Sequence, residues 1–196
     1  MQPQTFIFFG NVGSGKGTQV KLLQEFLKKK DDRECVYVYP GNEYRKLAEL
    51  NSLAGFLVKD PLSRGELLPG FLTDAIVVNI LISSLSKDKH LIVDGYPRAV
   101  SQSTSLKEMM EFFERREIKI ICIAVGEEEA KRRNRLRARH DDTDEGLEKR
   151  LEEYKKNVIP ALRDLQKDKN YMSYEINGEQ AIQDVHEEII RKLELN

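Results

Sequence analysis

The chain has 196 residues, a length that suits one domain with a hydrophobic core of its own. Its 32 basic and 33 acidic residues leave a formal net charge of −1, so the overall charge favours neither nucleic acid nor an acidic membrane as a partner. The sequence shows no run long enough to span a membrane and no basic-plus-apolar leader. We therefore expect a single domain without a nucleic-acid or membrane partner.

Two cysteines, Cys35 and Cys122, lie far apart in apolar runs and lack the spacing of a metal site. We interpret both as buried free thiols, which suits a reducing compartment. The sequence shows no internal repeat and no low-complexity tract. These features predict a cytoplasmic globular protein.

The first functional pattern is G-x-x-x-x-G-K at residues 10–16, between an apolar run and a helical pattern at 16–30. Strand, glycine-rich loop and helix in this order predict a phosphate-binding loop. Glycines let backbone N–H groups converge on a phosphate chain, and the helix N-terminus adds the positive end of its dipole. Lys16 adds a mobile charge for the β- and γ-phosphates. The usual motif has Ser or Thr after the lysine. Here Gly17 stands there, and Thr18 can offer its hydroxyl to Mg²⁺ or a phosphate.

A second strand is predicted at 35–39 and ends at the pair Pro40-Gly41. The stretch 41–70 shows helical segments and no strand alternation, so we expect a small helical insert there. Residues 71–86 follow as a helix with a wide apolar face, which predicts that most of this helix is buried.

The rest of the chain alternates strands with helices. The third strand is wholly apolar up to Asp94, as in strands buried on both faces of a parallel sheet. Pro160 is expected to kink or restart the helix in which it lies. The alternation predicts an α/β fold with a five-stranded parallel sheet and right-handed crossovers. The expected strands are 6–9, 35–39, 91–94, 118–125 and 171–176, and the last three expected helices are 127–139, 143–158 and 179–193.

Ligands of parallel sheets bind beyond the carboxyl ends of the strands. The loop at 10–15 and the turn at 94–98 both leave such ends, so we expect them on one edge of the sheet. Asp94 is interpreted either as a residue that holds Mg²⁺, directly or through water, or as a cap of the turn. Arg45 and Arg98 either pair with a phosphate or form surface ion pairs.

The helix predicted after the fourth strand is strongly basic. Arg132, Arg135 and Arg139 are three and four residues apart and share one face, an arrangement that destabilises a helix. Because a bound anion would remove that cost, we predict an anion site on this face. The alternative is a solvated basic face balanced by nearby acidic residues. The arginines expected to point to solvent are Arg133 and Arg137.

Segments along nearly the whole chain carry motifs of one family. They are GNVGSGKGTQ at 10–19, GNEYR at 41–45, GELLP at 65–69, DGYPRAVSQ at 94–102, RHDD at 139–142, KRL at 149–151 and NGEQAI at 177–182. Together they resemble the adenylate kinase family of nucleoside monophosphate (NMP) kinases. The resemblance implies a P-loop NTPase fold in three α/β/α layers, with a core at 1–40, 71–135 and 143–196, an NMP-binding insert at 41–70 and a very short lid at 136–142.

The resemblance also implies transfer of the γ-phosphoryl of ATP to AMP with Mg²⁺, which Asp94 would hold through water and for which Thr18 is a second candidate ligand. The protein would be a monomer. The ATP-binding residues implied are Gly13, Ser14, Gly15, Lys16, Gly17, Thr18, Arg135 and Gly178. The NMP-binding residues implied are Gly41, Arg45, Leu68, Gly95, Arg98 and Gln102. The catalytic residues implied are Lys16, Arg98, Arg139 and Arg150, which position and neutralise phosphates without a general base.

The chain departs from the family pattern at three places. Pro40 replaces a Thr or Ala beside the acceptor base, and Asn42 replaces an Asp of the Mg²⁺ water network. In the lid, Arg139 matches two family positions at once. Two alternatives therefore stay open: the same reaction on UMP or CMP, and a regulatory protein that binds ATP without turnover.

Overall fold

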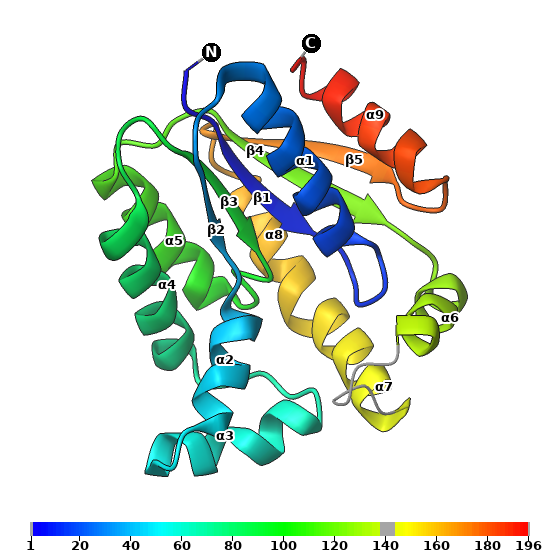
Figure 1. Cartoon of the computed structure of the whole chain (residues 1–196). Helices are drawn as coiled ribbons and strands as arrows, with labels where there is room; N and C mark the ends of the chain where they lie inside the picture. Colours follow the sequence, from blue (N-terminus) through cyan, green and yellow to red (C-terminus); the bar gives the residue numbers. More distant parts are fainter. Residues whose placement is uncertain (1, 138–143, 196) are drawn as a thin grey trace.

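A computed structural model describes residues 2–137 and 144–195 of the chain. Within this part, the strands form one five-stranded parallel sheet in the order β2-β3-β1-β4-β5 (Figure 1). The predicted α/β architecture and its strands are confirmed. The strands are β1 Thr5–Phe9, β2 Cys35–Val38, β3 His90–Asp94, β4 Ile118–Ala124 and β5 Tyr171–Asn177.

The centre of the sheet is β1, which pairs with β3 on one side and β4 on the other. Every residue of β1 and β3 is buried, as expected for strands covered on both faces. In the β1–β3 register Phe8 lies opposite Asp94. The carboxyl ends of these two strands are therefore adjacent, which confirms that the loop after β1 and the turn after β3 share one edge.

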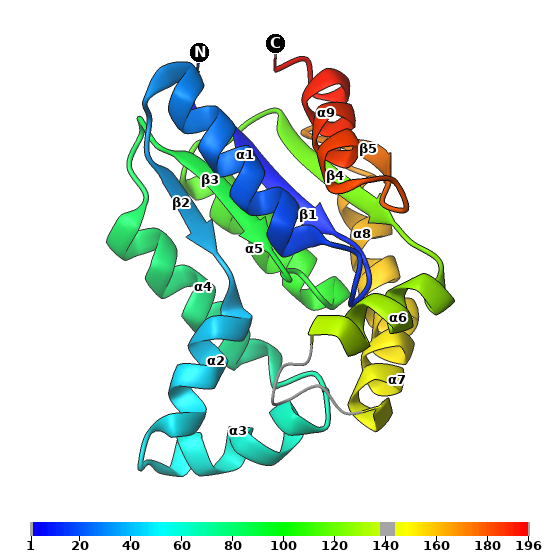
Figure 2. The same cartoon turned by 45° about the vertical axis from the view of Figure 1, so that its right-hand side comes forward.

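One face of the sheet is covered by α1 (Lys16–Asp31) and α9 (Ile182–Lys192) (Figures 1 and 2). Apolar side chains of both helices pack on strand residues that include Phe6, Phe8 and Ile92. The helical spacing of Val20, Leu23 and Leu27 puts them on one side of α1, and all three are fully buried. The residues of this cluster from α1 and α9 are Val20, Leu23, Leu27, Val185, Ile189 and Ile190, and Leu193 directly after α9 joins them.

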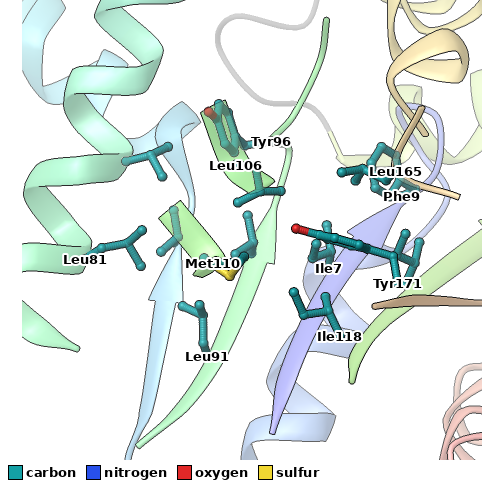
Figure 3. Packing of buried hydrophobic residues seen from close by; sticks show 14 of the residues in the cluster. Ile7, Phe9, Leu81, Leu91, Tyr96, Leu106, Met110, Ile118, Leu165 and Tyr171 are labelled. Carbon is teal, nitrogen blue, oxygen red and sulfur yellow. The ribbon is translucent and has the colours of Figure 1, made fainter. Parts of the chain in front are cut away.

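The other face is covered by α4 (Gly70–Ser84), α5 (Val100–Phe112) and α8 (Ile159–Leu165). Figure 3 shows Leu81, Leu106 and Met110 from these helices around strand residues such as Leu91 and Ile7. The sheet therefore lies between two helical layers, each with a separate hydrophobic cluster.

Two short helices, α2 (Pro40–Glu49) and α3 (Leu53–Ser63), lie beyond the carboxyl ends of β2 and β3 (Figure 2). Pro40 ends the strand as predicted and also begins α2, where its missing N–H would have no helical partner. The Ser52 hydroxyl caps α3 by accepting from Gly55 N at 3.0 Å. The predicted helical character of 41–70 is thus confirmed.

After β4 the chain forms α6 (Glu127–Arg137), and it resumes in α7 (Asp144–Glu153). A π-helical segment, η1 (Tyr154–Val158), joins α7 to α8, and Pro160 lies in the first turn of α8. A proline removes one backbone donor and crowds the carbonyl four residues before it, which locally widens the helix. The expected kink or restart at Pro160 is confirmed.

The prediction that α4 is mostly buried is wrong for part of the helix. Thr73, Val77 and Leu81, spaced four residues apart, are buried, whereas Phe71 and Ile82 are 75% and 70% exposed. Only one side of α4 reaches the sheet, and the other side has no described element packed on it. The apolar residues on all sides of this helix therefore led to an overestimate of how much of it is buried.

Cys35 and Cys122 are free thiols and half-buried. Burial raises the pKa of Cys35 to about 12 and that of Cys122 to about 11. Both thiols are therefore protonated, and so weakly nucleophilic, at neutral pH. Among the described residues no helix is long and apolar enough to cross a membrane.

Because one face of α4 is buried and the other is exposed, truncating two neighbouring residues of this helix should lower the free energy of unfolding by very different amounts. Leu81→Ala should lower the free energy of unfolding by about 3 kcal/mol, because it leaves a cavity beside the sheet. Ile82→Ala, at an exposed position, should cost about 0.5 kcal/mol or less. Urea unfolding followed by circular dichroism measures both, and equal costs would contradict the orientation of α4.

Candidate active site

The loop between β1 and α1 has the backbone shape of an anion cradle. Gly13 and Gly15 have φ of +81° and +90°, a region that side chains disfavour. A Cβ at Gly13 would collide with the carbonyl of Ala130 at the start of α6, so the loop packs directly against that helix. Gly15 is the N-cap of α1, and its conformation turns the first N–H groups of the helix towards the loop.

Lys16, the first residue of α1, folds its side chain back over this loop. Its Nζ donates to the carbonyl oxygens of Gly10 at 2.6 Å and Asn11 at 3.0 Å, and lies 3.4 Å from Ser14 Oγ. The ammonium group is thus placed at the centre of the loop, where the sequence predicts the phosphates. Gly17 and Thr18 follow on the exposed side of the first helical turn, so the Thr18 hydroxyl is accessible to a ligand.

Asp94, at the end of β3, lies next to this loop through the pairing of Phe8 with Asp94. Its side chain is only 3% exposed. Oδ2 accepts from the hydroxyl of Tyr37 at 3.0 Å, while Oδ1 is buried and has no hydrogen-bond partner among the described residues. A buried carboxylate oxygen needs a donor, and a water of hydrated Mg²⁺ can supply one. The described residues contain no cluster of three side chains that could by themselves hold a metal ion.

The turn after Asp94 fixes one predicted phosphate-binding arginine. Gly95 has φ +73°, and its carbonyl accepts from Arg98 Nε at 2.8 Å. The backbone N–H of Arg98 donates to Oε1 of the buried Gln102 at 2.7 Å. This bond orients the Gln102 carboxamide, so that its Nε2 donor points away from the turn. The structure therefore brings Gly95, Arg98 and Gln102 together as predicted.

The first insert helix, α2, contributes the second predicted arginine. Arg45 donates from Nη1 to the carbonyl of Gly41 at 2.9 Å, which holds the guanidinium along the start of α2. Gly41 itself packs under the ring of Tyr39, where a Cβ would approach the ring carbon Cζ to 2.9 Å. Tyr44 on α2 bonds to Thr73 on α4 at 2.5 Å, and burial raises the pKa of Tyr44, so this link stays neutral and intact.

The turn that follows α3 reaches α7. Gly65, with φ +71°, is so close to α7 that a Cβ would lie 2.6 Å from the Gly146 carbonyl and 2.9 Å from Arg150 Cγ. The partly buried Arg150 side chain therefore lies at the contact between insert and core. Leu68, three residues after Gly65, is half-buried in the segment that leads into α4.

On α6 the prediction for one arginine is wrong. Arg133 was expected to point to solvent, but its Nη1 donates to the carbonyl of Gly178 at 2.7 Å, and its side chain is 27% exposed. Glu129, one turn before it, draws Arg133 inwards and also pairs with Arg132, which is 62% exposed. Hydrogen bonds from these two guanidinium groups lower the pKa of Glu129 to about 2. Arg135 is exposed.

The predictions for Arg139 and for most of the lid at 136–142 fall outside the described residues, as does the side chain of Arg137. Sequence reasoning missed two further side chains at the site. Tyr37 contacts Asp94, and Arg133 contacts Gly178. The spacing of Glu129 and Arg133, four residues apart, is a signal that could have indicated an inward-turned ion pair.

These contacts predict different effects for two neighbouring arginines on α6. Arg133→Met should raise the KM for ATP about tenfold, since it removes a charged side chain next to the Gly178 turn, where the donor base is expected. Arg132→Met is the matched control, because this mostly exposed side chain pairs with Glu129 on its own helix and does not reach Gly178, and it should change this KM by about twofold or less. A larger effect for Arg132 than for Arg133 in steady-state kinetics would contradict the assignment.

Comparisons with known proteins agree with this geometry. A family model described as adenylate kinase matches residues 8–170. The chain is 32% identical over 188 residues to an adenylate kinase of Prochlorococcus marinus strain MIT 9301, covering 95% of this chain and 97% of the relative. An adenylate kinase of Azobacteroides pseudotrichonymphae is 29% identical over 191 residues, covering 95% of each chain. One of Mycolicibacterium smegmatis is 31% identical over 156 residues, covering 80% of this chain and 82% of the relative.

Proposed function

Because the chain belongs to the adenylate kinase family, we propose that it transfers the γ-phosphoryl group of ATP to AMP and forms two ADP. The observation that supports this most directly is the pairing of Phe8 with Asp94. This register puts the phosphate loop beside the turn that holds Arg98. A donor phosphate chain in the loop and an acceptor phosphate on the arginine would then face each other at one edge of the sheet.

The donor side acts through the backbone and Lys16. Residues 13–18 present N–H groups at the start of α1, where the helix dipole favours negative charge. Lys16 Nζ exchanges its carbonyl partners for phosphate oxygens and follows the transferring group. Mg²⁺, when bound with ATP, neutralises the β- and γ-phosphates. Asp94 would face that ion, with Oδ1 as the acceptor for one of its waters, and the Thr18 hydroxyl would be a second candidate contact.

The acceptor side positions a phosphate oxygen for attack. Arg98 and Arg45 pair with the phosphate of AMP, and the hydrogen bonds that already orient both guanidinium groups reduce the entropy lost on binding. Gln102 donates from Nε2 to the base, with Gly41 and Leu68 as neighbours. The attacking oxygen is already an anion, so no general base is required.

The remaining charge neutralisation comes from Arg150 and Arg139. Arg150 reaches the insert at Gly65, so closure of the insert and placement of this arginine occur together. At the donor base we propose Arg135, as the resemblance implies, and add Arg133 as a neighbour of this region, because Arg133 contacts the Gly178 carbonyl. The insert at 41–70 closes over the acceptor and helps to exclude water that would otherwise hydrolyse ATP.

A second candidate reaction uses UMP or CMP as the acceptor. Arg98 and Gln102 suit either kind of base, and Pro40 at the start of α2 does not decide between them. The ring of Tyr39 lies close to Gly41 at the same place. A regulatory protein that binds ATP without turnover is a third candidate. We also propose that the protein is a monomer, as the family resemblance implies, and that it lies in the cytoplasm. The two free thiols support the cytoplasm, because free thiols suit a reducing compartment.

The acceptor is best identified by measuring transfer from Mg·ATP to AMP, CMP, UMP and GMP side by side, with a reaction that lacks an acceptor. We expect ADP formation with AMP to exceed that with every other acceptor by about 100-fold in kcat/KM. Preference for CMP or UMP would keep the mechanism and replace the substrate. Binding of ATP without transfer to any acceptor would favour the regulatory candidate.

Arg98 provides a test of the acceptor site. Arg98→Ala should lower kcat/KM for AMP by about 100-fold, because a bidentate charged contact to the phosphate is lost, while the affinity for ATP changes little. The matched control is Arg116→Ala, an exposed arginine before β4 at the opposite edge of the sheet. Full transfer activity in Arg98→Ala would refute the site.

Lys16→Met tests the donor site instead. The loss in this variant should appear as a fall in kcat and in the affinity for ATP.

A further inference from the structure

The hydroxyl of Tyr37 has no role in the mechanism above, yet it makes the one described contact to the Asp94 carboxylate. Tyr37 lies on β2, the edge strand next to β3, and its hydroxyl donates to Asp94 Oδ2 at 3.0 Å. The bond joins residues 57 positions apart in the chain. It therefore forms only when the sheet has assembled with β2 and β3 in register.

Sheet geometry explains why this tyrosine reaches that acid. In the parallel pairing, Tyr37 lies opposite Ile92, and Asp94 follows Ile92 by two residues on the same face. Tyr37 and Asp94 are thus diagonal neighbours, a separation that a long aromatic side chain spans. Their common face is the one under α1, because Ile92 and Tyr37 both pack in the cluster that includes Val20 and Leu23. The pair therefore lies on the side of the sheet from which the phosphate loop and α1 approach.

The two carboxylate oxygens of Asp94 have different hydrogen-bond environments. Oδ2 is occupied by the tyrosine, and Oδ1 is the buried oxygen that has no partner among the described residues. The tyrosine ring is itself held, since it stacks on Tyr39 with centroids 5.9 Å apart and planes 9° apart. A fixed donor on one oxygen restricts rotation of the carboxylate. The other oxygen then keeps one direction, as a preorganised acceptor requires.

Tyr37 bonds to the carboxylate of Asp94 and would not itself contact the ion, so it would act as a second partner behind the group that faces the ion. Second partners of this kind commonly orient the groups that hold a metal.

We propose that Tyr37 is a positioning residue for the Mg²⁺ of the Mg·ATP complex, and that it acts by fixing the Asp94 carboxylate so that Oδ1 accepts from a metal-bound water. The inference rests on the proposed function for the identity of the ligand. It assigns to Tyr37 no contact with the substrate. It predicts that the hydroxyl contributes to the metal-dependent part of nucleotide binding and not to the metal-independent part.

The test compares equilibrium binding of ATP in excess Mg²⁺ and in EDTA, by isothermal titration calorimetry without an acceptor. The ratio of the two affinities measures the contribution of the metal. In Tyr37→Phe, which keeps the ring and its stacking on Tyr39, this ratio should fall about tenfold, while affinity in EDTA stays within about twofold. Thermal melting without ligand should show that the variant is folded.

Two further variants separate positioning from a general structural effect. Tyr174→Phe removes a hydroxyl beside the same hydrophobic cluster and should leave the ratio unchanged, because within the described part of the chain this hydroxyl bonds to Met172 Sδ at 3.9 Å. Asp94→Asn should lower the ratio, and adding Tyr37→Phe to Asp94→Asn should lower it no further, because the hydroxyl acts through that carboxylate.

Three results would overturn the proposal: an unchanged ratio in Tyr37→Phe, equal losses of affinity in Mg²⁺ and in EDTA, or additive effects in the double variant. The binding assay requires no phosphoryl transfer. A protein that shows the expected ratios but no transfer to any acceptor would therefore count against the proposed reaction and not against Tyr37.

Discussion

The site depends on the parallel pairing of β1 with β3. The chain places the phosphate loop and Asp94 about 80 residues apart, and only the register that sets Phe8 opposite Asp94 makes them neighbours. This register is strongly determined because both strands are buried on both faces, so a slip by one residue would exchange the two hydrophobic clusters. Hydrophobic packing on both faces of the sheet therefore fixes the position of Asp94 beside the phosphate loop.

The elements around this pairing divide the work by layer. The α1 layer supplies the anion-binding helix end and Lys16, while the turn after β3 supplies Arg98 on a backbone fixed by Gly95. The insert brings Arg45 over the strand ends, and hydrogen bonds such as that from Tyr44 to Thr73 anchor it to α4. The rigid core and the helical insert thus meet at the place where the phosphates of both substrates would lie.

Much of this arrangement is predictable from the sequence. Alternating apolar strands and helices predict the sheet, and the G-x-x-x-x-G-K loop predicts its functional edge, because both signals are local. The spacing of Glu129 and Arg133 is a local signal for their ion pair, but the contact of Arg133 with the Gly178 carbonyl was not predictable, because the two residues are 45 positions apart in the chain. The contact of Tyr37 with Asp94 was missed for the same reason: it depends on which strands become neighbours. Burial of α4 was overstated because periodicity does not show how many sides of a helix find a partner.

The close approach of Gly65 to α7 has a consequence for how the protein can vary. At this contact the backbone of Gly65 lies directly against the Gly146 carbonyl and the side-chain stem of Arg150, and no space is left for a side chain at position 65. Any substitution at Gly65 must therefore displace the Gly146 carbonyl or the stem of Arg150. A mutation at Gly65, in the insert, would then displace Arg150, which belongs to the core. In genetic terms, second-site suppressors of a Gly65 variant should map to α7.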